Sequence, residues 1–77
     1  MPYNPVSEAD AADLKKRFSH HPAKNDQNER YDALRAEYYS LGESIIRACP
    51  PCRERALALT HLEESLHWSI VAISRNE

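Results

Sequence analysis

Cations and imidazole rings gather around one predicted loop, and these residue types suit the binding of a small anion. His20 and His21 lie in the middle, and the surrounding cations are Lys15, Lys16, Arg17, Lys24, Arg30 and Arg35. Lysine and arginine hydrogen-bond phosphate oxygens, and flat rings stack on bases. The pattern therefore suggests a nucleotide ligand. The alternative stays open, because cations near a helix C-terminus also favour the helix dipole and arginines on exposed faces are usually solvated.

Residues that could support catalysis or hold a metal are not arranged for either task. The sequence has no nucleophile elbow, no carboxylate pair at a defined helical spacing and no glycine-rich phosphate loop. Cys49 and Cys52 have the spacing of half a zinc site, but no second pair follows, and His61 and His67 are too far apart to share a helical face. We expect no enzyme activity, no metal and no cofactor.

The two cysteines are expected as reduced thiols, because a bridge between them would close a very small loop. A second interpretation stays open for Cys52. If Cys52 begins a helix beside Arg53, the helix dipole would favour its thiolate and make it nucleophilic.

Size and composition limit the class of protein. The chain has 77 residues, a single glycine and a net charge of −2. Few glycines with abundant alanine, leucine, glutamate and arginine favour an all-α fold, and the charge argues against a protein that coats DNA. The sequence shows no signal peptide and no apolar run long enough to span a membrane, so we expect no membrane partner and a cytoplasmic location.

The elements that must position these residues are three helices. Ser7 and Asp10 form a capping-box pattern before a short helix over 8–18. Residues 19–28 lack an apolar period and predict a loop. A heptad seam then predicts a long helix, begun by a second capping-box pair at Asp26 and Glu29; its apolar positions are Tyr31, Leu34, Tyr38, Leu41, Ile45 and Ala48.

The two prolines of Cys49-Pro50-Pro51-Cys52 end that helix and force the chain to reverse. A third helix from Arg53 is expected to run antiparallel to the second for about 22 residues. We therefore expect an arm with a short helix and loop over 1–28 and an antiparallel two-helix hairpin over 29–77, within one domain.

The hairpin carries more apolar side chains than two helices can cover. Such a surplus on so small a unit predicts a homo-oligomer, since one hairpin offers too little core to offset the entropy of ordering. The residues expected at the subunit contact are Tyr39, Leu66, Trp68 and Ile70.

Three segments carry a resemblance to a known family: RFSHHP, ERYDALR and PPCRERALALTHLEESLHWSIVAISRNE. They are similar to the hairpin domain of phage anti-CBASS and Thoeris anti-defence proteins, and the resemblance covers residues 17–77. It implies a sponge without enzyme activity, a helical oligomer that is a hexamer in well-known relatives. Such a sponge sequesters cyclic di- or trinucleotides or cyclic ADP-ribose isomers, so that bacterial immune effectors are not activated.

The resemblance also implies binding residues. The stacking tyrosine of the family falls at or near His20, and its phosphate-binding lysine falls near Arg35, so both positions are substituted. Arginine keeps the charge, and stacking could pass from His20 to Phe18 or His21. An arginine that relatives use for cyclic trinucleotides aligns with Val71. The family often has serine at Cys52, where cysteine is expected to be a poor cap. The alternative function is a helical oligomerising adaptor that binds a host protein.

Overall fold

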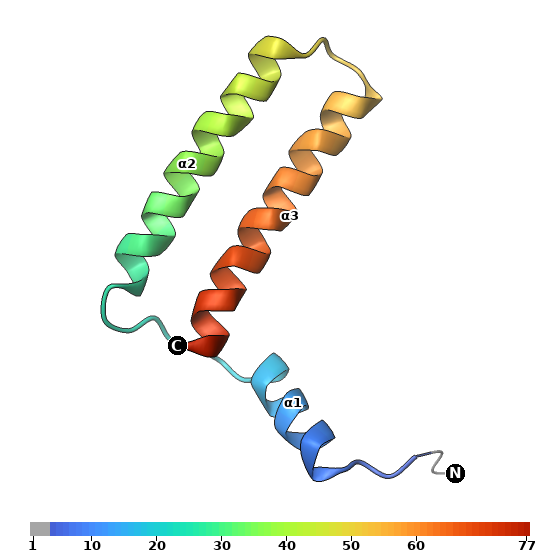
Figure 1. The fold of residues 1–77 in the computed structure, drawn as a ribbon, viewed down its shortest axis with the longest axis vertical. Helices are drawn as coiled ribbons and strands as arrows, with labels where there is room; N and C mark the ends of the chain where they lie inside the picture. Colours follow the sequence, from blue (N-terminus) through green and yellow to red (C-terminus); the bar gives the residue numbers. More distant parts are fainter. Residues whose placement is uncertain (1–3) are drawn as a thin grey trace.

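Three helices and their connections make up the computed structural model, which describes residues 4–77. The helices are α1 (Glu8–Phe18), α2 (Gln27–Ala48) and α3 (Arg53–Asn76). Figure 1 shows α2 and α3 side by side as a hairpin, with α1 continuing beyond its open end. The described residues contain no strand, which confirms the predicted all-α class.

Helix α1 begins as the sequence predicts. The Ser7 hydroxyl accepts a hydrogen bond from the backbone N–H of Asp10 at 3.0 Å, and the Asp10 carboxylate accepts one from the Ser7 N–H at 3.3 Å. This reciprocal capping box satisfies two backbone donors at the helix start. The helix ends where Ser19 turns to an extended conformation, after a last turn that holds three basic residues.

The start of α2 differs from the prediction. The helix begins at Gln27, inside the segment expected as loop, and Asp26 makes no side-chain capping bond. Asp26 has φ −90° and ψ 12° instead of the extended backbone usual at a cap, and its carboxylate pairs with Arg30 at 3.2 Å. Gln27 closes the turn instead: its buried side chain accepts from the Lys24 N–H at 3.0 Å, and its own N–H donates to the Lys24 carbonyl at 3.1 Å.

The reversal between α2 and α3 is held by one arginine and one thiol. The Arg55 guanidinium donates to the carbonyl oxygens of Cys49 at 3.3 Å and Ile46 at 3.5 Å, which satisfies acceptors at the end of α2. Cys52 was expected to be a poor cap, yet its Sγ accepts from the Arg55 N–H at 3.3 Å. The extended backbone of Cys52 aims the sulfur at the first turn of α3.

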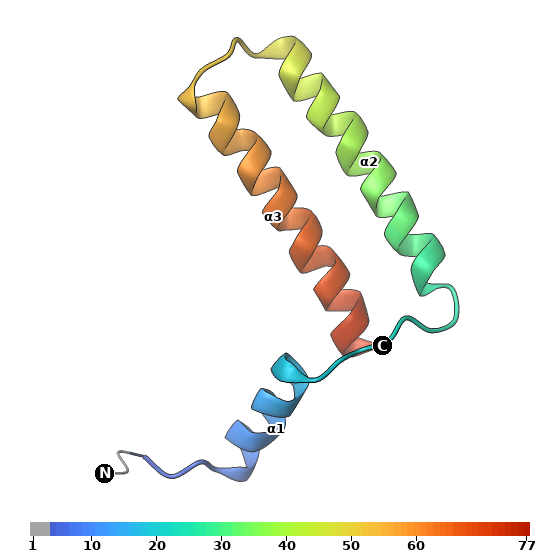
Figure 2. The same cartoon turned by 180° about the vertical axis from the view of Figure 1, so that it is seen from behind.

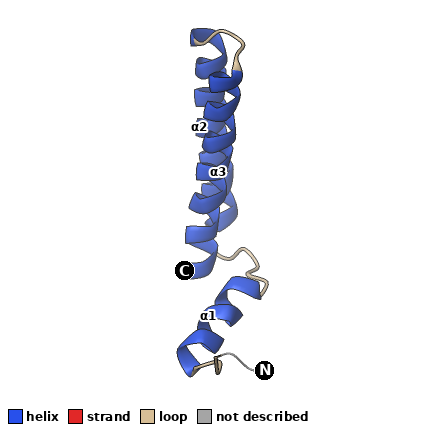
Figure 3. Ribbon diagram, turned by 90° about the vertical axis from the view of Figure 1, so that its right-hand side faces the viewer, coloured by secondary structure: helices blue, strands red, loops and turns tan. Residues whose placement is uncertain are grey.

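The hairpin is a single layer without a closed interior. No other element covers either face of the two helices, as the views from the front and from behind show (Figure 2). Viewed from the edge, α2 and α3 overlap and form a layer one helix thick (Figure 3). Among the described hydrophobic residues only Tyr31 is buried, and the predicted seam residues Leu41 and Ala48 are exposed.

Dimensions quantify how open the chain is. Its accessible surface is 6294 Å², against about 4,800 Å² expected for a folded monomer of 8.9 kDa. The radius of gyration is 17.6 Å, against about 11.5 Å for a compact chain of 77 residues. The helices are defined by their caps and connections, and apart from Tyr31 their described apolar residues are only partly covered or exposed.

Candidate functional site

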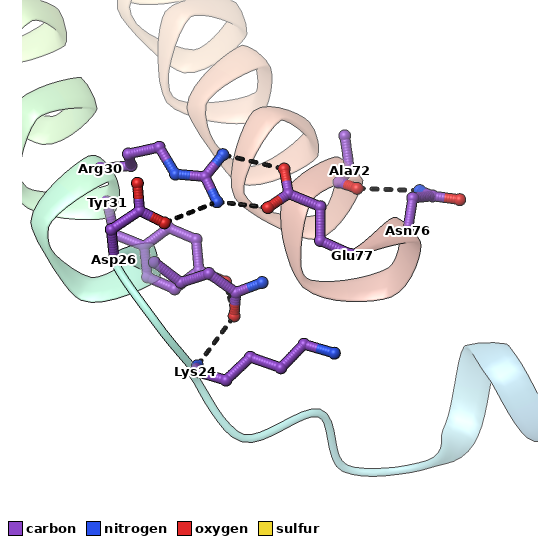
Figure 4. Close-up of polar contacts among 8 residues, drawn as sticks. Lys24, Asp26, Arg30, Tyr31, Ala72, Asn76 and Glu77 are labelled. Atoms are coloured by element: carbon purple, nitrogen blue, oxygen red, sulfur yellow. Dashed lines mark hydrogen bonds and ion pairs between the residues drawn. The ribbon is translucent and has the colours of Figure 1, made fainter.

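Arg30 is engaged by carboxylates at the open end of the hairpin. Its two terminal nitrogens donate to the two carboxylate oxygens of Glu77, one of them at 2.8 Å, and one nitrogen also contacts Asp26 at 3.2 Å. Figure 4 shows this group, which we call the clasp: Arg30 and Asp26 from the start of α2 and Glu77 from the end of α3. Hydrogen bonding from Arg30 lowers the pKa of Glu77, and the same bond raises the pKa of Arg30. The positive charge of Arg30 is therefore compensated by two carboxylates of the same chain.

Arg35 is placed differently and is more exposed than Arg30. Its side chain is 54% exposed, and its only described carboxylate contact is Asp32, one turn away at 3.4 Å. The guanidinium carbon lies 6.0 Å from the centroid of the Tyr31 ring. An exposed pair one turn apart on a helix is weak, so a phosphate can compete for this arginine.

Arg35 stands at the edge of an apolar groove between α2 and α3. The groove has a volume of about 330 Å³. Its lining residues are Arg35, Tyr38, Tyr39, Leu59, Leu62, Glu63 and Leu66. At its side the Tyr38 hydroxyl shares a hydrogen bond with Ser65 at 2.7 Å, and this bond lowers the pKa of Tyr38. Two of the residues expected at a subunit contact, Tyr39 and Leu66, lie in this groove.

The ring residues predicted for ligand binding lie outside the groove, at the end of α1 (Phe18) and on the connection between α1 and α2 (His20 and His21). Phe18 is 82% exposed, and His20 is also exposed. A ring nitrogen of His21 lies 2.8 Å from the Lys16 carbonyl. Lys24 lies on the same connection, near the clasp (Figure 4). The single chain does not bring these rings together with Arg35 in one hollow.

A second hollow was not predicted as a site. It has a volume of about 380 Å³ and lies where α1 meets the end of α3. We call it the junction hollow; its lining residues are Asp13, Lys16, Arg17, Trp68, Val71, Ala72, Arg75 and Asn76. Trp68, expected at a subunit contact, lines this hollow, whereas Ile70 is half-buried on α3. The sequence signal that could have found it is the cation Arg75 in the last turn of α3, two helical turns beyond Trp68.

Metal and disulfide chemistry is not assembled in the described part of the chain. Cys49 and Cys52 are both free thiols, and residues 4–77 hold no group of three or more potential metal ligands. Within the same residues, no helix is both long enough and apolar enough to cross a bilayer.

Comparison with known proteins identifies the fold. The model of the Acb2/Tad1 hairpin domain matches residues 10–74, which is most of the chain. No curated protein and no solved structure gave a match. The matched segment contains nearly all of α1 together with the hairpin, and it agrees with the resemblance seen in the sequence. The chain therefore belongs to the Acb2/Tad1 hairpin-domain family, the family of anti-CBASS and Thoeris sponges.

Proposed function

We propose that this protein is an anti-defence sponge of a phage, acting inside an infected bacterium. It binds cyclic di- or trinucleotides or cyclic ADP-ribose isomers and holds them without degrading them, so that immune effectors stay inactive. The observation that carries this proposal is membership of the hairpin-domain family over residues 10–74. Sequestration requires groups that bind phosphate and stack on bases, and it requires no catalytic group.

Arg35 is the phosphate-binding residue of this proposal. It is exposed beside the groove, and its partner Asp32 sits in a weak surface pair. Arg30 is a poorer candidate, because a phosphate would have to displace Glu77 from a two-pronged contact within the clasp. The exposed position of Arg35 and the pairing of Arg30 with Glu77 both support the choice of Arg35, the position that the family resemblance also implies.

A second copy of the chain completes the pocket. The rings of Phe18, His20 and His21 do not line the groove of their own chain, so a neighbouring copy supplies them beside Arg35. The apolar groove and the excess of exposed surface support an oligomer, since packing copies over Tyr39 and Leu66 would cover area that one hairpin leaves wet. We propose a hexamer, as the family resemblance implies.

Calorimetry against cyclic dinucleotides, cyclic trinucleotides and cyclic ADP-ribose isomers tests this function. We expect tight binding of at least one, with the ligand recovered intact by mass spectrometry after heat release. Arg35→Ala should weaken binding about ten- to hundredfold, the effect of losing a charge-assisted hydrogen bond.

Arg47→Ala is the matched control. Arg47 is also an exposed arginine of α2 paired with a carboxylate of its own helix, Glu43, and it does not line the groove. Its substitution should leave affinity unchanged. Recovery of a cleaved ligand would contradict sequestration. If none of the tested cyclic nucleotides binds, the adaptor function would be favoured.

A further inference from the structure

The junction hollow concentrates positive charge in a chain whose net charge is −2. Three cations, Lys16, Arg17 and Arg75, line it together with one carboxylate, Asp13. The hollow therefore carries a net charge of +2, the complement of a phosphate group with two negative charges.

Hydrogen bonds between α1 and α3 hold two of these cations in place without neutralising them. Lys16 Nζ donates to the Asn76 side-chain oxygen at 2.8 Å, and Arg75 donates to the Arg17 carbonyl at 3.2 Å. Both acceptors are neutral, so the ammonium and the guanidinium keep their charge and further donors. Arg17 differs, because Asp13 pairs with it at 2.8 Å. Lys16 and Arg75 are thus the cations available to an anion.

Trp68 adds a flat surface to the same hollow. The residue is 56% exposed, and the His67 ring contacts the indole edge to face, with centroids 5.4 Å apart and planes at 70°. An indole held in this way offers a face on which a base can stack. A stacking ring beside two uncompensated cations is the combination that a nucleotide requires.

The volume decides how large the ligand is. At about 380 Å³ the hollow is near the lower limit of small-molecule sites, which span about 300–1,000 Å³. We propose that the junction hollow binds one nucleoside monophosphate, with the base on Trp68 and the phosphate between Lys16 and Arg75. This site is separate from the messenger pocket at Arg35, and it assigns Trp68 to ligand contact in place of the subunit contact expected from the sequence.

Tryptophan fluorescence tests the proposal directly, because Trp68 is the only tryptophan of the chain. The full-length protein is titrated with AMP, with excitation at the red edge of the indole band, where nucleotides do not absorb. We expect a saturable change in emission with AMP. Adenosine and inorganic phosphate should each bind at least about tenfold more weakly, because each lacks one of the two contacts.

Two charge-removing variants locate the phosphate. Arg75→Gln and Lys16→Gln should each weaken AMP binding about tenfold, whereas Arg47→Gln, far from the hollow at the other end of α2, should not. Because Lys16 and Arg75 each also link α1 to the end of α3, circular dichroism checks that both variants keep their helix content. Arg35→Ala should bind the cyclic messenger about ten- to hundredfold more weakly and bind AMP as the wild type does, which separates this site from the proposed function.

Fluorescence that does not respond to millimolar AMP would overturn the site. An AMP response that is equal in the wild type and in both Gln variants would overturn the assignment of the phosphate to Lys16 and Arg75. Phosphate that binds as tightly as AMP would overturn the stacking on Trp68.

Discussion

Glu77 accepts two hydrogen bonds from Arg30 and so joins the end of α3 to the start of α2 across 47 residues of sequence. At the opposite end of the hairpin, the backbone turn over residues 49–52 connects the two helices. The clasp is therefore a polar contact that holds the two helices together at the open end. Because the Arg30 guanidinium is paired with carboxylates in the clasp, it is less available to bind a ligand. This relationship leaves Arg35, one and a half turns further along α2, as the exposed arginine beside the groove.

The clasp predicts a dependence of stability on pH. Because Arg30 lowers the pKa of Glu77 below its ordinary 4.5, the clasp stabilises the fold fully above pH 4.5 and less as the pH falls through the lowered pKa. Near neutral pH, Glu77→Gln should melt at a lower temperature than the wild type. The difference should be modest, since the pair is partly exposed, and it should vanish in acid. Melting curves of the two proteins across this range measure it; a difference that grows in acid would contradict the assignment.

Tyr38 links the middles of α2 and α3 through its hydroxyl. Tyr38→Phe removes the bond to Ser65 at 2.7 Å and should lower the denaturation midpoint. Tyr39→Phe is the matched control, because Tyr39 is 72% exposed and should tolerate loss of its hydroxyl. Urea denaturation followed by circular dichroism compares the two variants. Equal midpoints would mean that the Tyr38 hydroxyl is satisfied by water.

Gly42, the only glycine, lies inside α2 without a positive φ. A Cβ built there would lie 3.8 Å from a Leu62 methyl and 3.9 Å from a Leu59 methyl, which are ordinary contacts. Gly42→Ala should therefore stabilise the protein by about 0.5–1 kcal/mol, because alanine loses less backbone entropy in a helix. The free energy of unfolding in urea measures this effect. Destabilisation would indicate that another copy packs closely at Gly42.

The groove predicts the mass of the assembly. Wild-type protein should elute as a multiple of the 8.9 kDa chain, and Tyr39→Ser should shift it to smaller species. Tyr39 is 72% exposed in the single hairpin, so its loss should act on association more than on folding. Ile46→Ser is the control, since Ile46 is an exposed apolar residue of α2 outside the groove. Light scattering after size exclusion measures the masses; a folded monomer of wild type would contradict the oligomer.

The local pattern of the sequence determined the helices, because their limits depend on neighbouring residues. Ser7 and Asp10 marked the start of α1, and the two prolines marked the end of α2. The start of α2 was missed by two residues, since Gln27 replaces Asp26 as the side chain that closes the turn. The sequence pattern predicted Asp26 as the capping side chain of α2, because aspartate is common at that position. In the structure its carboxylate pairs with Arg30 instead.

The tertiary structure decided which charged and aromatic groups meet. Sequence grouped Arg30 with Arg35, yet only the approach of the end of α3 shows that Glu77 occupies Arg30 and leaves Arg35 open. Likewise Lys16, Trp68 and Arg75 belong to one hollow because the end of α1 lies against the end of α3, a contact between residues almost sixty positions apart. Helical periodicity reports the near neighbours of a residue, and it carries no information on contacts made at that separation.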